Sequence, residues 1–470
     1  MTGRVGVLAI TAILAHLLGP GEFGTVAIAL ALIALLDRLA DAGLTQALVA
    51  APADRLGASA DSVFTAALAL SALLAASLAA AAIPLSHYFA DAELDGVIAL
   101  LALALPLRAL GSTHYALAQR RLEFRGRAIA EFAEVATRAA VGIPLAIAGA
   151  GVWSLVASFL AGTAALTVAL WIVVDWRPRA RLDRVVLRAL APFGLKLSGV
   201  DIAGTVISQL DYIFIGKLLG PLALGVYTLA FRIPELLIVN LALVAGQVLY
   251  PGFAALDRDA LARGFLISLR YSALIALPAA TIAAILSEPL LVSLFGEGWR
   301  SGAATMRILC ASSLLLALGI PGGTILKASG RAGRLLALAL ARLIGLAVLL
   351  AIFASDGIEA VAWCVLGGSL AGEAAALVLA RSVAGFEWSA PPRALAPALA
   401  AALAAAPAAL AALRIGSEPL AVVVGAGAAT MSALLALRLL APETIGYLRG
   451  HLFGRGSAPA PAPEITGAGT

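Results

Sequence analysis

Long apolar runs, separated by short polar or basic segments, repeat along the whole chain. They lie at about 4–18, 24–50, 62–83, 97–118, 128–149, 152–174, 193–217, 222–248, 265–287, 301–326, 333–353, 358–380, 394–413 and 419–440. A helix needs about 20 apolar residues to cross the hydrocarbon core of a bilayer. The pattern therefore predicts an all-α polytopic membrane protein with about 14 transmembrane helices.

The first run is shorter than the others. As a helix, residues 5–18 would be about 21 Å long, against a hydrocarbon core of about 30 Å. The run also lacks the small-residue cleavage site of a signal peptide. We expect it to be the back half of a first, truncated helix whose start is missing from this open reading frame.

Composition makes the membrane assignment firm. The chain has 470 residues, of which 62% are hydrophobic and 13% are charged, whereas soluble domains carry about 25% charged residues. Fourteen spans leave no room for a large soluble catalytic domain. Cys310 and Cys364 both lie inside apolar runs, which argues against a secreted protein built on disulfides.

Basic residues alternate between successive loops. If the N-terminus lies inside, the outside loops hold only Lys217, Arg300 and Arg414, and the other loop arginines and lysines fall inside. One outside loop is acidic instead, with residues 91–95 holding three carboxylates. The positive-inside rule then predicts an even number of spans, with both termini in the cytoplasm.

A short motif occurs twice at equivalent positions. Leu-Leu-Gly-Pro followed by a glycine stands at 17–24 and again at 218–225, each time at an outside turn. The repeat predicts two pseudo-symmetric six-helix lobes, 1–180 and 181–385, related by an axis along the membrane normal, which is a transporter architecture. Residues 386–445 would add two further spans, and the Ala/Pro-rich segment 446–470 is predicted to be a disordered cytoplasmic tail.

Charged residues inside the spans are the candidate functional groups, since each costs about 2.5–3.5 kcal/mol at a lipid-facing helix centre. Arg108, Arg307 and Arg342 have no carboxylate one turn away on their own helix. With Arg38 and Arg232, they are candidates for binding an anionic head group. Three further carboxylates are candidates for coupling to an ion gradient, namely Asp41, Asp201 and Glu373.

Helical spacing also predicts local ion pairs. Glu134 and Arg138 are four residues apart, and Arg232 and Glu235 are three apart, so each pair shares a helix face. Such pairs can fix the register of neighbouring helices without touching a substrate. For both pairs, a structural role and a functional role are equally compatible with the spacing.

Several kinds of chemistry have no signature in the chain. Residues 216–217 lack the upstream glycine and the hydroxyl residue of a phosphate-binding loop, so we expect no ATPase activity. The four histidines have no metal-binding spacing. We therefore expect no cofactor and no metal site. The basic loops are not interleaved with aromatic residues, so nucleic acid is not an expected partner.

Several segments resemble one family. The segments 17–24 and 39–49, the turn 119–125, and the second-half segments 211–221 and 224–232 are similar to bacterial polysaccharide flippases of the multidrug/oligosaccharidyl-lipid/polysaccharide exporter superfamily. The resemblance covers about residues 8–380 and departs at the front, where most of the first helix is missing.

The resemblance implies a V-shaped bundle of two lobes that flips an undecaprenyl-diphosphate-linked oligosaccharide across the cytoplasmic membrane. The product would serve lipopolysaccharide or exopolysaccharide biosynthesis, with a polysaccharide polymerase and chain-length machinery as partners. The unpaired arginines would line a cleft between lobes that rock against each other. Three alternatives stay open: a multidrug or cation antiporter of the same superfamily, a membrane-embedded polymerase or ligase, and an uncoupled scramblase or scaffold.

Overall fold

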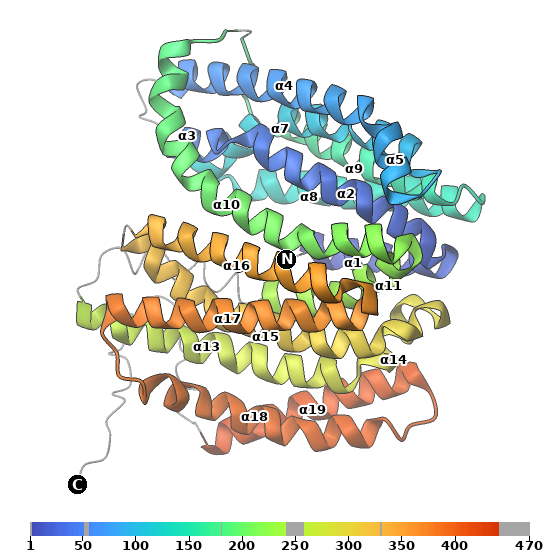
Figure 1. Cartoon of the computed structure of the whole chain (residues 1–470), viewed down its shortest axis with the longest axis vertical. Coiled ribbons are helices and arrows are strands. Elements are labelled where there is room, and N and C mark those ends of the chain that lie inside the picture. Colours follow the sequence, from blue (N-terminus) through green and yellow to red (C-terminus); the bar gives the residue numbers. More distant parts are fainter. Residues whose placement is uncertain (1, 51–55, 180, 241–257, 330, 441–470) are drawn as a thin grey trace.

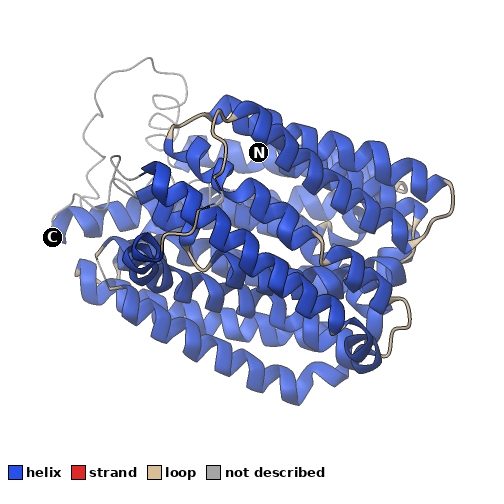
Figure 2. Ribbon diagram, turned by 90° about the horizontal axis from the view of Figure 1, so that it is seen from above, coloured by secondary structure: helices blue, strands red, loops and turns tan. Residues whose placement is uncertain are grey.

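The computed structural model describes residues 2–50, 56–179, 181–240, 258–329 and 331–440. Throughout these ranges the regular structure is helical and contains no strand (Figures 1 and 2). The predicted all-α fold is therefore confirmed. The predicted cytoplasmic tail, 446–470, lies outside the described residues.

The N-terminal half holds nine helices within the described residues. They are α1 (Thr2–Leu17), α2 (Pro20–Asp41), α3 (Leu44–Ala50), α4 (Leu56–Ala80), α5 (Ala82–Phe89), α6 (Leu94–Leu101), α7 (Ala104–Arg120), α8 (Phe124–Ile147) and α9 (Val152–Val173). The predicted runs 24–50 and 97–118 are each divided between two helices. The run 24–50 breaks at Ala42 and Gly43, which both have positive φ.

The C-terminal half begins with α10 (Arg184–Leu218) and α11 (Gly220–Pro234), which continues as the π-helical segment η2 (Glu235–Val239). After the gap follow α13 (Arg258–Ile285), α14 (Ser287–Phe295), η3 (Glu297–Gly302), α15 (Ala303–Ala328), α16 (Ala332–Phe353), η4 (Ala354–Asp356) and α17 (Ile358–Ala384). The last two helices are α18 (Ala390–Ala412) and α19 (Glu418–Leu440).

Eleven helices within the described ranges are long and apolar enough to cross a membrane. The remaining three predicted runs correspond to the short α1, to α8 and to α10, which is 35 residues long. Every predicted run thus contains a helix, while the number of fourteen crossings stays a prediction.

The helices form two groups, with α10 running between them (Figure 1). In the N-terminal group, α9 packs against both α7 and α8, and α1 lies on α8. In the C-terminal group, α15 packs between α13 and α17, and the pair α18 and α19 lies against α13. One apolar cluster joins the groups, because it contains Ile28 of α2 together with Leu224 and Tyr227 of α11.

The two copies of the repeated motif meet at the N-terminal ends of α2 and α11. A Cβ atom at Gly24 would overlap the backbone carbonyl of Pro221, and a Cβ atom at Gly225 would overlap that of Pro20. Each glycine therefore packs against the proline of the other copy. In both copies the proline lies in the first turn of its helix, where its missing N–H costs no intrahelical hydrogen bond.

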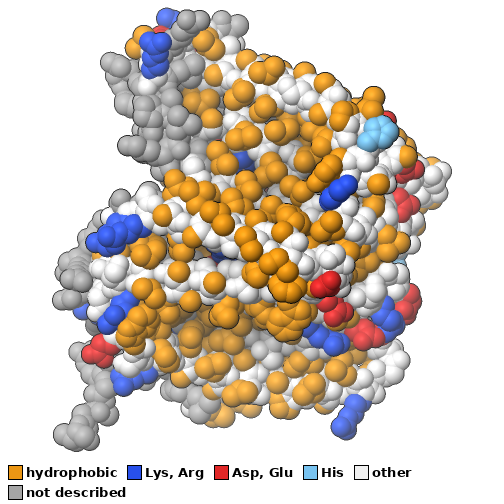
Figure 3. Space-filling model, in the orientation of Figure 1, with side chains coloured by type: hydrophobic (Ala, Val, Ile, Leu, Met, Phe, Trp, Pro, Cys, Tyr) orange, Lys and Arg blue, Asp and Glu red, His pale blue; other side chains and the backbone are white. Residues whose placement is uncertain are grey.

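We call the end of the bundle that contains these turns the acidic end. Asp91 lies there and accepts a hydrogen bond from Thr25 Oγ1 at 2.6 Å, and Lys217 Nζ donates to the Tyr88 carbonyl at 2.5 Å. At the opposite, basic end, Arg120 Nη1 donates to the carbonyls of Leu48 and Val49. Figure 3 shows most of the visible acidic side chains at the right edge and several basic ones at the left edge.

Candidate functional site

The central cavity lies between the two halves and has a volume of about 520 Å³. Helices α1, α2, α7, α8 and α9 line it from one side, and α10 and α11 from the other. Its wall is largely apolar, with a small set of charged and amide side chains, which are Arg108, Arg138, Gln209, Arg232 and Glu235. A polar group in such a wall can orient a ligand that the apolar surface encloses.

Two of the guanidinium groups flank one aromatic ring. The Cζ atom of Arg108 lies 5.3 Å from the centroid of the Phe159 ring, and that of Arg138 lies 4.8 Å from it. Cation–π contacts of this kind hold a guanidinium near a ring while its N–H groups stay available. Arg232 lines the same cavity from α11, so both halves contribute positive charge.

Each of the three arginines has a carboxylate partner. Arg108 Nη1 lies 3.3 Å from Asp37 Oδ2, Arg138 Nη2 lies 2.5 Å from Glu134 Oε1, and Arg232 Nη1 lies 3.3 Å from Glu235 Oε2. The side chains of Arg108 and Arg232 are 36% and 37% exposed, whereas that of Arg138 is 17% exposed. A guanidinium has five N–H donors, so a single contact leaves Arg108 and Arg232 able to bind an anion.

Arg138 is held by its surroundings on α9. Gly162 leaves room for it, since a Cβ atom there would overlap the arginine side chain. Ser158 Oγ donates to the Arg138 carbonyl at 2.9 Å. The Nε of Arg138 is buried and has no hydrogen-bond partner among the described residues.

A second cavity, the N-terminal cavity, lies among α2, α3, α4, α7 and α9 and also has a volume of about 520 Å³. Arg38 and Asp41 line it, together with Asp37, Arg108 and Glu134. Asp41 Oδ1 accepts hydrogen bonds from both the backbone N–H and the hydroxyl of Thr45. The hydroxyl contact links the end of α2 to the first turn of α3.

A third cavity, the C-terminal cavity, lies within the C-terminal half and shares no lining residue with the central one. It contains the pair Arg342 and Glu373, whose Nη1 and Oε1 atoms are 3.1 Å apart. Arg342 Nη2 also donates to Ser369 Oγ at 3.0 Å. Gly372 leaves room for Arg342 as Gly162 does for Arg138.

Asp201, a candidate for ion coupling, lies on α10 near the basic end. Its Oδ2 accepts from Gln46 Nε2 of α3 at 2.8 Å, and its Oδ1 lies 4.0 Å from Lys327 Nζ of α15. The carboxylate therefore connects an N-terminal helix with a C-terminal one.

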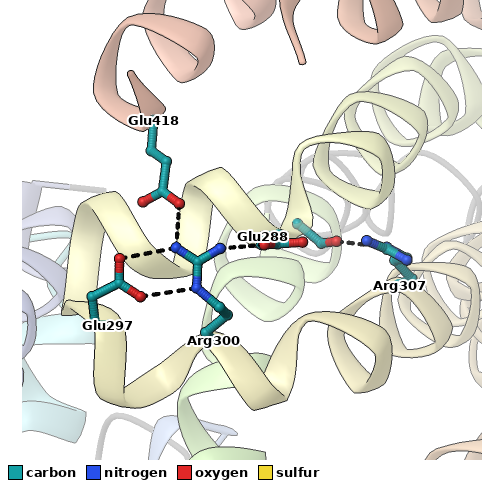
Figure 4. A network of polar contacts seen from close by, with 6 residues as sticks. Glu288, Glu297, Arg300, Arg307 and Glu418 are labelled. Carbon is teal, nitrogen blue, oxygen red and sulfur yellow. Dashed lines mark hydrogen bonds and ion pairs between the residues drawn. The ribbon is translucent and has the colours of Figure 1, made fainter. Parts of the chain in front are cut away.

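Arg307 lies away from all three cavities, toward the acidic end. Its Nε donates to Ser287 Oγ at 2.9 Å. Nearby, Arg300 contacts the carboxylates of Glu288, Glu297 and Glu418 (Figure 4), with Nε 2.8 Å from Glu297 and Nη2 2.6 Å from Glu418. Since Glu418 begins α19, this cluster fastens the last helix to α14 and η3.

The residues that were predicted to bind the head group therefore lie in different parts of the structure. Arg108 and Arg232 lie in the central cavity, Arg38 in the N-terminal cavity, Arg342 in the C-terminal cavity, and Arg307 in none of them. The sequence interpretation treated Arg138 only as half of an ion pair, yet it lines the central cavity too. Its spacing from Glu134 indicated the ion pair, and nothing in that spacing indicated the cavity.

A family model described as "Polysaccharide biosynthesis protein" matches residues 13–304. The chain belongs to this family. Its relatives include the succinoglycan biosynthesis transport protein ExoT of Rhizobium meliloti (strain 1021), which is 29% identical over 370 residues, or 77% of this chain and 74% of that one. The lipopolysaccharide biosynthesis protein WzxC of Escherichia coli (strain K12) is 25% identical over 68% of this chain and 65% of its own length.

Solved structures share the fold of this polysaccharide biosynthesis protein. The lipid II flippase MurJ in an inward closed conformation superposes with a TM-score of 0.75 at 13% identity, covering 94% of this chain and 98% of that one. An inward-facing multidrug resistance MATE family transporter of the MOP superfamily gives a TM-score of 0.67 at 17% identity, covering 83% and 96%. These two likenesses show a common fold, and the family match confirms the predicted relationship to polysaccharide biosynthesis proteins.

Proposed function

We propose that this protein is a flippase that moves a lipid-linked oligosaccharide between the leaflets of a membrane, with undecaprenyl diphosphate as the lipid carrier. The observation that carries the proposal is the central cavity, which receives arginines from both halves. The family match and the name of ExoT as a transport protein support it. In this role the protein is a transporter rather than an enzyme.

The chemistry of the cavity suits a lipid diphosphate. Guanidinium groups bind phosphate oxygens through parallel, charge-assisted hydrogen bonds. Arg108 and Arg232 would turn from their carboxylates toward the diphosphate, and Arg138 would add positive charge to the same wall. The resident carboxylates balance these charges when the cavity holds no anion, which keeps three arginines tolerable inside a membrane.

The transport cycle that we propose is alternating access, in which two lobes, 1–180 and 181–385, move against each other. Residues 386–445 would move together with the second lobe. The glycine contact between α2 and α11 closes the acidic end in this conformation, so the substrate would enter from the basic end. By the positive-inside rule we infer that the basic end faces the cytoplasm of a bacterial inner membrane. A polymerase with its chain-length machinery would then take over the flipped product.

Reconstitution tests the proposal. The purified protein in liposomes, given a fluorescent undecaprenyl-diphosphate-linked oligosaccharide, is expected to transfer the label between leaflets. Arg108→Ala and Arg232→Ala are expected to reduce the transfer rate by about 10- to 100-fold, since each removes charged hydrogen bonds to the diphosphate. Arg307→Ala is the matched control, because Arg307 lies outside the central cavity.

Normal transfer in both cavity variants would contradict the proposal, as would transport of an organic cation in place of the lipid. Running the assay with and without a pH gradient also tests the proposed coupling carboxylates. Asp41→Asn, Asp201→Asn or Glu373→Gln should abolish any dependence on the gradient that the wild type has.

A further inference from the structure

The N-terminal cavity differs in chemistry from the other two. Thirteen of its twenty lining residues have polar side chains, among them Arg38, Asp41, Gln46, Ser112, Tyr115 and Gln119. In the central and C-terminal cavities most lining residues are apolar or glycine. Polar groups inside a membrane bundle are costly unless water or a ligand solvates them, so this cavity is built to hold something that forms hydrogen bonds.

The N-terminal cavity adjoins the proposed diphosphate site. Arg108 lines both it and the central cavity. A small space of about 300 Å³ forms a second connection, because Tyr115 and Glu134 line it and the N-terminal cavity, while Val7 and Arg232 line it and the central cavity. A ligand whose phosphates contact Arg108 would therefore lie beside the N-terminal cavity.

The charges of the N-terminal cavity nearly cancel. Asp37 is paired with Arg108, and Glu134 with Arg138, which leaves Arg38 and Asp41 as one charge of each sign. Such a lining presents donors and acceptors without a strong net field. It favours an uncharged, hydroxyl-rich ligand over a second anion.

Buried hydroxyl groups add acceptors to this lining. Thr163 Oγ1 donates to the Phe159 carbonyl at 2.9 Å, and Thr167 Oγ1 donates to that of Leu107 at 2.9 Å. Since each donor proton is used by the backbone, the hydroxyl oxygens face the cavity as acceptors. Carboxylate, amide and hydroxyl groups together can satisfy the alternating donors and acceptors of sugar hydroxyls.

The two halves differ at this point despite their repeat. In the C-terminal cavity, Lys327, Arg342 and Glu373 are accompanied mostly by glycine and aliphatic residues. Among the described residues, a polar lining of this kind surrounds the N-terminal cavity and not the C-terminal one.

We propose that the N-terminal cavity is a saccharide subsite that holds uncharged sugars next to the diphosphate and so sets which glycan is carried. The inference rests on the proposed function, because it assumes that Arg108, Arg138 and Arg232 hold the diphosphate. Gln119, Thr163 and Tyr115 are then residues that determine specificity.

Binding to two lipids tests the subsite. The full-length protein in detergent is titrated with undecaprenyl diphosphate and with undecaprenyl diphosphate bearing a neutral oligosaccharide. The double variant Gln119→Ala/Thr163→Val is expected to weaken binding of the sugar-bearing lipid by about 5- to 10-fold and to leave the sugar-free lipid unchanged. A glycan with carboxylate groups is expected to bind the wild type more weakly than the neutral one.

Thr324→Val is the matched control. Thr324 Oγ1 donates to the Ile320 carbonyl at 2.8 Å, as Thr163 does to Phe159, but Thr324 lines the C-terminal cavity. This variant should bind both lipids like the wild type. Thermal unfolding of each variant verifies that the fold is retained, and Thr163→Val alone serves if the double variant unfolds.

The outcomes separate the two proposals. If wild type binds both lipids and the double variant loses affinity for both equally, or for neither, the saccharide subsite is wrong while the proposed function stands. Tighter binding of the carboxylated glycan by the wild type would also overturn it. If the wild type binds neither lipid, the proposed function fails, and the subsite fails with it.

Discussion

Three charged side chains in this bundle lie against a glycine of a neighbouring helix, which makes room for them. Gly162 faces Arg138, Gly372 faces Arg342, and Gly319 faces the carboxylate of Glu373. A long ionic side chain lying against bare backbone is shielded from lipid and kept close to its partner. Breaking one partner of such a pair leaves a buried charge, which is strongly destabilising.

Substitution of Gly319 by alanine is expected to lower stability by about 1–3 kcal/mol, the usual range for overpacking. The new Cβ atom would displace the Glu373 carboxylate from Arg342. Gly323→Ala is the control, because it lies one turn further along α15 and its Cβ atom would meet nothing within 4 Å. Equal thermal unfolding of the two variants would contradict the interpretation.

Sequence spacing could predict only those site contacts that lie on one helix. Arg138 with Glu134 and Arg232 with Glu235 follow from intervals of four and three residues. The partner of Arg108 is Asp37, which is 71 residues away, and no periodicity relates α2 to α7. The contact of two arginines with Phe159 likewise depends on how α7, α8 and α9 cross.

At the scale of elements, the backbones of α2 and α11 touch each other at the acidic end. Proline and glycine in the first turn of each helix allow an approach that any side chain would prevent. Apolar periodicity predicts that these two helices exist. It does not predict that the repeated turns meet, since the repeat says nothing of which faces pack together.

Gly24→Ala is expected to separate α2 from α11, because the atom that its Cβ meets is backbone of Pro221 and cannot move aside. A single cysteine at Thr228, introduced into a cysteine-free background, reports the change. Its labelling by a reagent added at the acidic end should rise several-fold. Gly21→Ala, whose Cβ meets nothing within 4 Å, should behave like the unsubstituted protein. Unchanged labelling in Gly24→Ala would show that the contact does not close this end.

Composition does not predict where one apolar run is divided between two helices. Residues 24–50 form one apolar run, yet the chain breaks at Ala42, whose φ is +42°. Alanine carries no signal for a left-handed conformation, and Gly43 beside it, whose φ is +71°, is a residue type that is also common inside membrane helices. The break depends on the bonds between Thr45 and Asp41, and it brings Gln46 of α3 to Asp201 of α10.

At the scale of the whole molecule, α18 and α19 belong to the C-terminal half. They pack along α13 through small side chains such as Ala398, Ala401 and Ala405, which are fully buried. At the acidic end, Glu418 adds an ionic contact to Arg300. We expect these helices to travel with the C-terminal half during transport.

Arg300→Gln is expected to lower the melting temperature at low ionic strength and to have little effect at high salt, because the contacts of Arg300 are exposed and therefore screened. Thermal unfolding in the two salt concentrations measures the difference. Arg414→Gln, in the connection between α18 and α19, is the control. A salt-independent loss in Arg300→Gln would mean that packing, not charge, holds α19.

The reciprocal contact of Gly24 with Pro221 and of Gly225 with Pro20 has a bearing on the origin of the chain. Two surfaces that each offer the same turn to the other have the geometry of an isologous dimer. A single ancestral half would already have carried both sides of this contact and could have paired with a second copy of itself. Fusion of two such copies would then have allowed each half to acquire its own cavity lining.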